Sequence, residues 1–219
     1  MNVLIIGGGG FIGQKLARAL VARGELNGKA LSSINLVDVM EPGAIDGGSI
    51  AVNTSICDIT NTASVAEAVT ADTDVIYLLA AIVSAHAEED FDAGWSINMM
   101  GTLNVLERAR ELGNKPRVVF TSSIAVYGGE VPDPIVDHSF LNPQTSYGAQ
   151  KAVGELLIND YSRKGYIDGV GFRLPTISVR PGKPNRAASS FMSSILREPL
   201  NGEEAVCPVD ADFPHYYLS

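Results

Sequence analysis

The stretch Gly7-Gly8-Gly9-Gly10-Phe11-Ile12-Gly13 decides the fold of this 219-residue chain. The branched apolar run at 2–6 before it predicts a buried parallel strand, and the apolar residues spaced by four after it predict a helix over 11–23. Gly7 permits a tight turn, Gly10 lets the backbone approach a pyrophosphate, and Gly13 allows close helix packing. Backbone N–H groups at a helix start bind phosphate. We therefore interpret the stretch as a dinucleotide-binding turn, with Phe11 and Ile12 beside the cofactor, rather than a flexible loop.

The acid Asp38 ends the next predicted strand, at 33–38. A carboxylate at this place accepts hydrogen bonds from both ribose hydroxyls and repels a 2'-phosphate. No Arg or Lys follows closely to bind such a phosphate. The sequence therefore predicts NAD as the cofactor, in preference to NADP.

Predicted strands and helices alternate along the chain. The strands are 2–6, 33–38, 53–57, 74–79, 117–121 and 169–174, and the helices are 11–23, 62–70, 90–112 and 146–163. This alternation indicates an α/β fold with a Rossmann-type, doubly wound parallel sheet. Ligands bind beyond the carboxyl ends of the strands in such sheets. We expect the residues at those ends to meet in one crevice: Asp38, Asp58, Ala80, Ala81, Ser122 and Ser123.

Tyr147 and Lys151 stand four residues apart in a predicted helix, so they share one face of it. A nearby ammonium favours the ionised form of a phenol. A free phenol has a pKa of about 10, so a base near neutral pH needs a pKa lower by roughly 3 pH units, or about 4 kcal/mol. The pair fits a proton-abstracting tyrosine; the alternative is a surface helix pair without a chemical role.

Composition and charge exclude several classes of protein. The chain is 46% hydrophobic, which suits one globular enzyme domain, and no apolar run approaches the roughly 20 residues of a membrane span. The net charge of -9 argues against a nucleic-acid partner. Cys57 and Cys207 lack disulfide or metal spacing, and we interpret both as buried thiols in a reducing compartment. We expect a cytoplasmic protein without a metal site, membrane anchor or nucleic-acid partner.

Five motifs lie between residues 2 and 181: the glycine turn, Leu78-Leu79-Ala80-Ala81, Asn98-Met99-Met100-Gly101-Thr102, Phe120-Thr121-Ser122-Ser123-Ile124-Ala125-Val126-Tyr127-Gly128 and Tyr147-x-x-x-Lys151. Together they resemble the extended short-chain dehydrogenase/reductase family, the group of NAD-dependent sugar epimerases and dehydratases. The resemblance implies that Tyr147 is the catalytic acid/base and that Lys151 holds the nicotinamide ribose and lowers the pKa of the tyrosine. Ser123, rather than Ser122, would hydrogen-bond the reacting substrate oxygen. The implied cofactor contacts also include Asp58, Ile59, Leu79, Ala80, Ala81, Asn98 and Pro175.

The region after the last predicted strand departs from the epimerase pattern. Residues 173–185 differ from the Arg-x-x-Asn-Val-Tyr-Gly-Pro-like stretch of nucleotide-sugar enzymes, whereas 187–190 and 197–200 are similar to the D-erythronate dehydrogenases, which oxidise the 2-hydroxyl of a four-carbon sugar acid with NAD. Residues 169–197 contain no acid, so Arg180 and Lys183 are candidates to bind a substrate carboxylate. The alternative is a solvated basic loop.

We therefore expect an NAD-dependent oxidoreductase that converts a small, D-erythronate-like sugar acid to a 2-oxo acid. Alternatives are an NAD-dependent nucleotide-sugar epimerase/dehydratase and a non-catalytic NAD-binding regulatory protein. Residues 1–175 would form the NAD-binding domain with the catalytic Ser, Tyr and Lys. Residues 176–219 would begin a small C-terminal substrate lobe, which we expect to be incomplete because family members usually continue further. Analogy with the family also predicts a homodimer.

Overall fold

A six-stranded parallel sheet forms the centre of the protein in a computed structural model, which describes residues 1–182, 188–210 and 212–218. The strand order is β5-β4-β1-β6-β7-β8. The chain runs outward from β1 to β4 and β5 and then returns to β6 on the other side of β1, so the switch point lies between β1 and β6. The predicted doubly wound sheet is confirmed. Its strands are β1 (Asn2–Ile6), β4 (Ser33–Asp38), β5 (Ala51–Ile56), β6 (Val75–Leu78), β7 (Arg117–Ser123) and β8 (Asp168–Leu174).

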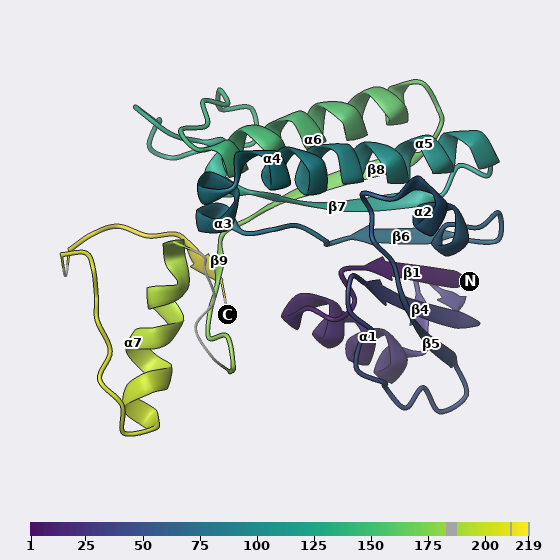
Figure 1. Cartoon of the computed structure of the whole chain (residues 1–219), viewed down its shortest axis with the longest axis horizontal. Helices are drawn as coiled ribbons and strands as arrows, with labels where there is room; N and C mark the ends of the chain where they lie inside the picture. The colour runs from purple at the N-terminus through teal and green to yellow at the C-terminus, as the bar shows by residue number, and fades with distance from the viewer. Residues whose placement is uncertain (183–187, 211, 219) are drawn as a thin grey trace.

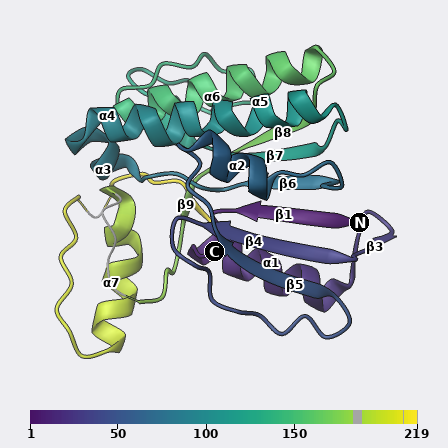
Figure 2. The ribbon, with the colours of Figure 1, turned by 45° about the vertical axis from the view of Figure 1, so that its right-hand side comes forward.

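Helices cover the sheet on both faces (Figures 1 and 2). Helix α1 (Phe11–Arg23) lies on one face, and α2 (Thr62–Ala68), α5 (Thr102–Leu112) and α6 (Ser146–Arg163) lie on the other. The alternation of side chains along β1 explains why its sequence is apolar throughout. Val3 and Ile5 pack with α1, whereas Leu4 and Ile6 pack with α2, α5 and α6.

The helix predicted over 90–112 is present as one helical run over 91–112, but part of this run is π-helical. Short helices α3 (Ser84–Glu89) and α4 (Phe91–Gly94) precede a π-helical segment, η1 (Trp95–Gly101), and only then does α5 begin. At the end of η1 a Cβ on Gly101 would lie 2.6 Å from the side chain of Ile59, so a glycine is needed for this close packing. A π-turn shifts the following side chains around the helix axis, and here it accompanies the burial of Asn98.

Several short elements have no counterpart in the predicted pattern. They are β2 (Glu25–Leu26), β3 (Lys29–Ala30), the 3-10 turns η2 (Ile124–Val126) and η3 (Ala188–Ser190), β9 (Thr176–Ile177), α7 (Phe191–Leu200) and β10 (Tyr217–Leu218). Strand β10 pairs with β9 in parallel, with Tyr217 opposite Thr176. Helix α7 stands apart from the helix layers of the sheet (Figure 1). The end of the described chain therefore returns to the point where β8 ends.

The structure corrects one expectation about the cysteines, because Cys57 is buried but Cys207 is exposed. None of the described helices has the length and apolar character needed to cross a membrane. Within the same described residues, no group of three or more His, Cys, Asp or Glu side chains is placed to hold a metal ion.

Candidate active site

A cavity of about 490 Å³ opens at the carboxyl ends of β1, β6, β7 and β8. Its wall combines the glycine turn, the predicted catalytic residues and the segment after β8. Of the residues predicted from the sequence, it contains Gly7, Gly10, Phe11, Ile12, Gly13, Leu79, Ala81, Ser123, Tyr147, Lys151, Pro175 and Arg180. Lys183 lies outside the described residues.

The glycine turn is shaped by close backbone approaches. Gly7 has φ +92°, and a Cβ there would lie 2.7 Å from the Ala80 nitrogen. A Cβ on Gly13 would lie 2.4 Å from the Gly7 oxygen. No side chain caps α1 at Gly10, and the first helical residues line the cavity. The N–H groups of an uncapped helix start attract anions, so this end of the cavity suits a pyrophosphate.

Asp38 is held against the glycine turn at the end of β4. One carboxylate oxygen accepts a hydrogen bond from Gly9 N at 3.0 Å, and the other accepts from Val39 N at 2.8 Å. Each oxygen keeps a lone pair for a further donor. Asp38 itself is not part of the cavity wall. Its place beside the turn suits an acceptor for ribose hydroxyls.

The two residues predicted to border the adenine lie outside the cavity wall. Asp58 is exposed, and its side chain accepts from the backbone and hydroxyl of Thr60. Ile59 is buried in the core beneath α5, and its carbonyl accepts from Asn104 at 2.9 Å. The Ile59 side chain therefore serves packing.

The serine pair at the end of β7 divides into two environments. Ser122 is buried and donates to Glu155 at 2.5 Å. Both serines belong to the cavity wall, but the Ser123 hydroxyl is not tied to a carboxylate, and its oxygen accepts from Ala125 N at 3.1 Å. The backbone N–H occupies one lone pair of Ser123, so its proton remains available to an oxygen in the cavity. This geometry favours Ser123 as the substrate-facing serine.

Helix α6 brings Tyr147 and Lys151 to the cavity because its first turn approaches η2 closely. A Cβ on Gly148 would lie 2.2 Å from the Ala125 oxygen, so only glycine permits this contact. Lys151 is 2% exposed, donates to Thr121 O at 2.8 Å, and has its Nζ 5.7 Å from the centroid of the Tyr147 ring. The predicted pair therefore shares one wall.

Burial and neighbouring groups shift the pKa of Tyr147 in opposite directions. Burial raises the pKa of its phenol, whereas the hydrogen bond with Ser123 and the charge of Arg180 lower it. Burial also lowers the pKa of Lys151 from 10.5 to about 8. Arg180 is thus a cation that lowers the pKa of Tyr147 in this structure.

Asn98 is buried behind the site rather than in its wall. Its side chain accepts from Ile82 N at 2.9 Å and donates to Gln150 Oε1 at 2.7 Å. Gln150 immediately precedes Lys151. Asn98 therefore joins the loop after β6 to the helix that carries Tyr147 and Lys151.

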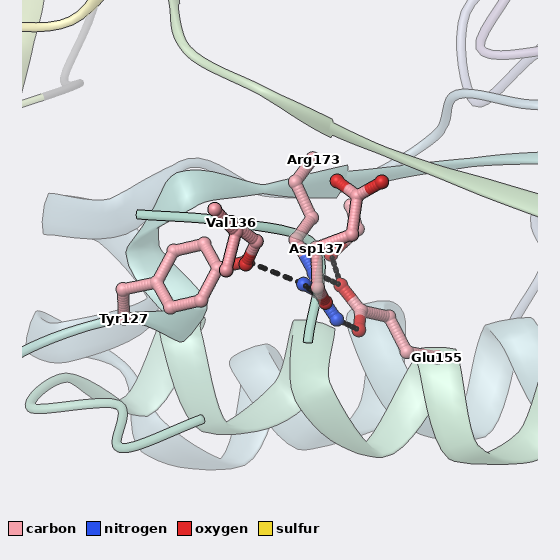
Figure 3. A network of polar contacts seen from close by, with 6 residues as sticks. Tyr127, Val136, Asp137, Glu155 and Arg173 are labelled. Carbon is pink, nitrogen blue, oxygen red and sulfur yellow. Dashed lines mark hydrogen bonds and ion pairs between the residues drawn. The ribbon is translucent and has the colours of Figure 1, made fainter. Parts of the chain in front are cut away.

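Arg173 ties the same helix to the sheet and to the loop after η2 (Figure 3). It forms a two-pronged ion pair with Glu155, at 2.9 and 2.7 Å, and donates to the Asp137 carbonyl at 2.9 Å and to the Tyr127 hydroxyl. Glu155 also accepts from Ser122. These contacts give Arg173 a structural role.

Arg180 projects from a backbone that α7 fixes on both sides. Its N–H donates to Ser193 at 2.9 Å, and its carbonyl accepts from Arg197 at 2.7 Å. No carboxylate pairs with the Arg180 guanidinium among the residues that the structure describes. An unpaired guanidinium in a cavity wall suits an anionic ligand.

The sequence reasoning missed other residues of the wall. His215 and Thr176 face the same cavity, as do Val83, Ser84 and Ser189. His215 comes from the far end of the described chain and reaches the site through the β9–β10 pairing. Two-residue strands carry no periodicity, so the sequence offered no signal for this contact.

Comparisons with known proteins agree with this geometry. The profile of the "NAD dependent epimerase/dehydratase family" matches residues 3–211. D-erythronate dehydrogenase from Cupriavidus necator is 52% identical over 223 residues, an alignment that covers all of this chain and 68% of the relative. D-erythronate dehydrogenase from Haemophilus influenzae is 49% identical, over 97% of this chain and 66% of its own length.

A solved structure is also similar throughout. The crystal structure of a protein described as the nucleoside-diphosphate-sugar epimerase from Agrobacterium tumefaciens superposes with a TM-score of 0.94 at 51% identity. It covers 100% of this chain, which in turn spans 65% of that protein. The chain thus spans about two thirds of the length of the relatives it matches.

Proposed function

The chain belongs to the NAD dependent epimerase/dehydratase family, and we propose that its protein is an NAD-dependent dehydrogenase that oxidises the 2-hydroxyl of a small sugar acid, such as D-erythronate, to a 2-oxo acid. The observation that carries the proposal is the Arg180 guanidinium. It lines the same cavity as Tyr147 and acts on the charge of that phenol, and it has no carboxylate partner among the described residues. A substrate carboxylate fits this cation.

NAD is the cofactor of this family, and the turn at Gly7–Gly13 fits it because added Cβ atoms would collide with backbone. The uncapped start of α1 would hold the pyrophosphate, and Asp38 the adenosine ribose. Lys151 would hold the nicotinamide ribose. When bound, NAD supplies the acceptor for the hydride released from the substrate carbon.

The protein's own side chains would orient the acid and move one proton. Arg180 would hold the carboxylate through two parallel hydrogen bonds. Ser123 would donate to the 2-hydroxyl oxygen, and Tyr147 would remove the hydroxyl proton. Burial opposes ionisation of Tyr147, and the charge of Arg180 favours the phenolate that this step needs. The Ser123 hydroxyl has one proton, so its hydrogen bond to Tyr147 would turn to the 2-hydroxyl oxygen when the acid binds.

Nucleotide-sugar epimerisation is the second candidate, because the similar Agrobacterium tumefaciens structure carries an epimerase description. The two reactions differ in redox balance. A dehydrogenase accumulates NADH, whereas an epimerase returns the hydride to its substrate. The two D-erythronate dehydrogenases at about 50% identity favour the first reaction. A non-catalytic NAD-binding role is disfavoured because the cavity holds Ser123, Tyr147 and Lys151 together.

The test offers full-length protein and NAD to D-erythronate, L-threonate and other small 2-hydroxy acids, with UDP-sugars as controls, and follows NADH absorbance. We expect turnover with at least one acid. Tyr147→Phe should abolish this turnover, whereas Tyr166→Phe, which keeps a ring distant from the cavity, should not. NADH silence with every acid, together with epimerised UDP-sugar by NMR, would establish the second candidate instead.

We also propose that residues 1–175 act as the NAD-binding domain and that 176–219 begin the substrate lobe. Helices α5 and α6 lie side by side on one face (Figure 1), and Leu156 on α6 is 65% exposed. We propose a cytoplasmic homodimer that pairs these helices across a two-fold axis. Sedimentation that shows only monomer at micromolar concentration would contradict the dimer.

A further inference from the structure

His215 lines the same cavity as Tyr147 and Arg180. The β9–β10 pairing holds its backbone, because Thr176 N donates to Tyr216 O at 3.2 Å and Ser178 N donates to Leu218 O at 2.9 Å. The imidazole also contacts two rings, with centroids 5.9 Å from Phe191 and 6.2 Å from Phe213. The position of the side chain is therefore set both by the strand pairing and by ring contacts.

One ring nitrogen of His215 is engaged and the other is not. Thr176 Oγ1 lies 2.8 Å from His215 Nε2, a hydrogen bond that fixes the ring orientation. Nδ1 has no hydrogen-bond partner within the described part of the chain. Thr176 also lines the cavity. A threonine hydroxyl and an imidazole both donate and accept hydrogen bonds, so the pair suits a hydroxyl group better than an anion.

Different side chains of the cavity suit different groups of the proposed substrate, and only the carbons beyond the reacting carbon lack an assigned partner. Arg180 offers the cation for a carboxylate, and Ser123 with Tyr147 offers the groups for the reacting hydroxyl. These groups account for the first two carbons of a hydroxy acid. Among the other polar side chains of this wall, Thr176 and His215 are hydrogen-bonded to each other, and they come from β9 and the segment before β10.

We propose that the Thr176–His215 pair hydrogen-bonds a hydroxyl on the substrate carbon chain beyond the reacting carbon, and so selects polyhydroxy acids over simple 2-hydroxy acids. This inference rests on the proposed function, since it specifies the substrate class of the same cavity. A site built to hydrogen-bond a hydroxyl discriminates against the analogue that lacks it, because the polar groups of the site are then left unpaired.

The test compares D-erythronate with 2-hydroxybutanoate, which has the same four carbons without the 3- and 4-hydroxyls. His215→Phe keeps an aromatic ring in contact with Phe191 and Phe213 but removes both nitrogens. We expect kcat/KM for D-erythronate to fall about tenfold, mainly through KM, because one hydrogen bond is lost. The value for 2-hydroxybutanoate and the KM for NAD should stay unchanged.

Two further variants separate recognition from folding. Thr176→Val removes only the hydroxyl from the pair and should lower the preference for D-erythronate in the same direction. His138→Phe makes the matched change in the exposed loop before α6 and should alter neither acid. Thr176→Val also provides the test if His215→Phe fails to fold.

The possible outcomes distinguish the two proposals. An unchanged ratio of the two kcat/KM values in the His215 and Thr176 variants, with wild-type oxidation of D-erythronate, overturns the inference and leaves the proposed function standing. An equal fall in kcat/KM for both acids also overturns the inference, since it would mean that the substitution disturbs the structure of the site and not the recognition of a hydroxyl. Oxidation of neither acid by the wild type overturns both proposals.

Discussion

Replacing Lys151 with methionine should stabilise the protein in a pH-dependent way while it abolishes turnover. Burial lowers the pKa of this amine from 10.5 to about 8. The difference of about 2.5 pH units corresponds to about 3 kcal/mol of disfavoured charge in the folded state. Methionine has a similar length and carries no charge, so the Lys151→Met variant escapes this cost.

The numbers of protons bound by the folded and unfolded states determine how the stability of the wild type changes with pH. Below pH 8 both states of the wild type are protonated, and the cost is fully present. As pH rises from about 8 to about 10.5, the unfolded state binds more protons than the folded state, so wild-type stability increases and the cost disappears. The cost is about 3 kcal/mol near pH 7.5 and about 1 kcal/mol near pH 9.5. The lost hydrogen bond to Thr121 O offsets the gain by about 1 kcal/mol at each pH.

The assay is urea unfolding of wild type and Lys151→Met near pH 7.5 and near pH 9.5. The stability advantage of the variant should shrink by about 2 kcal/mol over this range. Lys164→Met, at an exposed helix end, serves as the matched control and should show no such change. Parallel stability curves for wild type and Lys151→Met would refute the inference that burial depresses the pKa of this amine.

Two other substitutions test the turn and the ion pair. Gly13→Ala should weaken NAD binding at least tenfold by calorimetry, because its Cβ would meet the Gly7 oxygen at 2.4 Å, whereas Gly43→Ala, with its nearest neighbour at 3.9 Å, should bind normally. Arg173→Gln should lower the free energy of unfolding by about 2 kcal/mol in urea, because Glu155 is left largely buried without its cation; a loss below about 0.5 kcal/mol would contradict this reading.

Local patterns made the cofactor half of the fold predictable. The strand 2–6 and the helices 11–23 and 146–163 have the bounds expected from the sequence, because apolar spacing and glycine positions act over a few residues. The π-helical segment before α5 was not predictable in this way. It depends on contacts of Gly101 with Ile59 and of Asn98 with Gln150, all of which require the folded sheet.

The residues of the candidate site likewise include some that the sequence predicted and some that only the folded structure brings to the cavity. Ser123, Tyr147 and Lys151 followed from motifs, and all three line the cavity. His215 could not follow from the sequence, since it reaches the wall through a two-residue pairing with a distant strand. The role of Arg180 toward Tyr147 is an electrostatic effect of position, which sequence spacing does not encode.

The cavity is lined by main-chain atoms in one part and by side-chain atoms in another. The glycine turn presents main-chain groups, whose positions persist through many side-chain replacements, whereas the far wall presents the side chains of Thr176, Arg180 and His215. If the protein has the proposed activity, single replacements after β8 would redirect it to a new acid without disturbing its use of NAD. Gene duplicates within this family would be expected to diverge first in that segment, and directed evolution toward unnatural hydroxy acids should begin its libraries there.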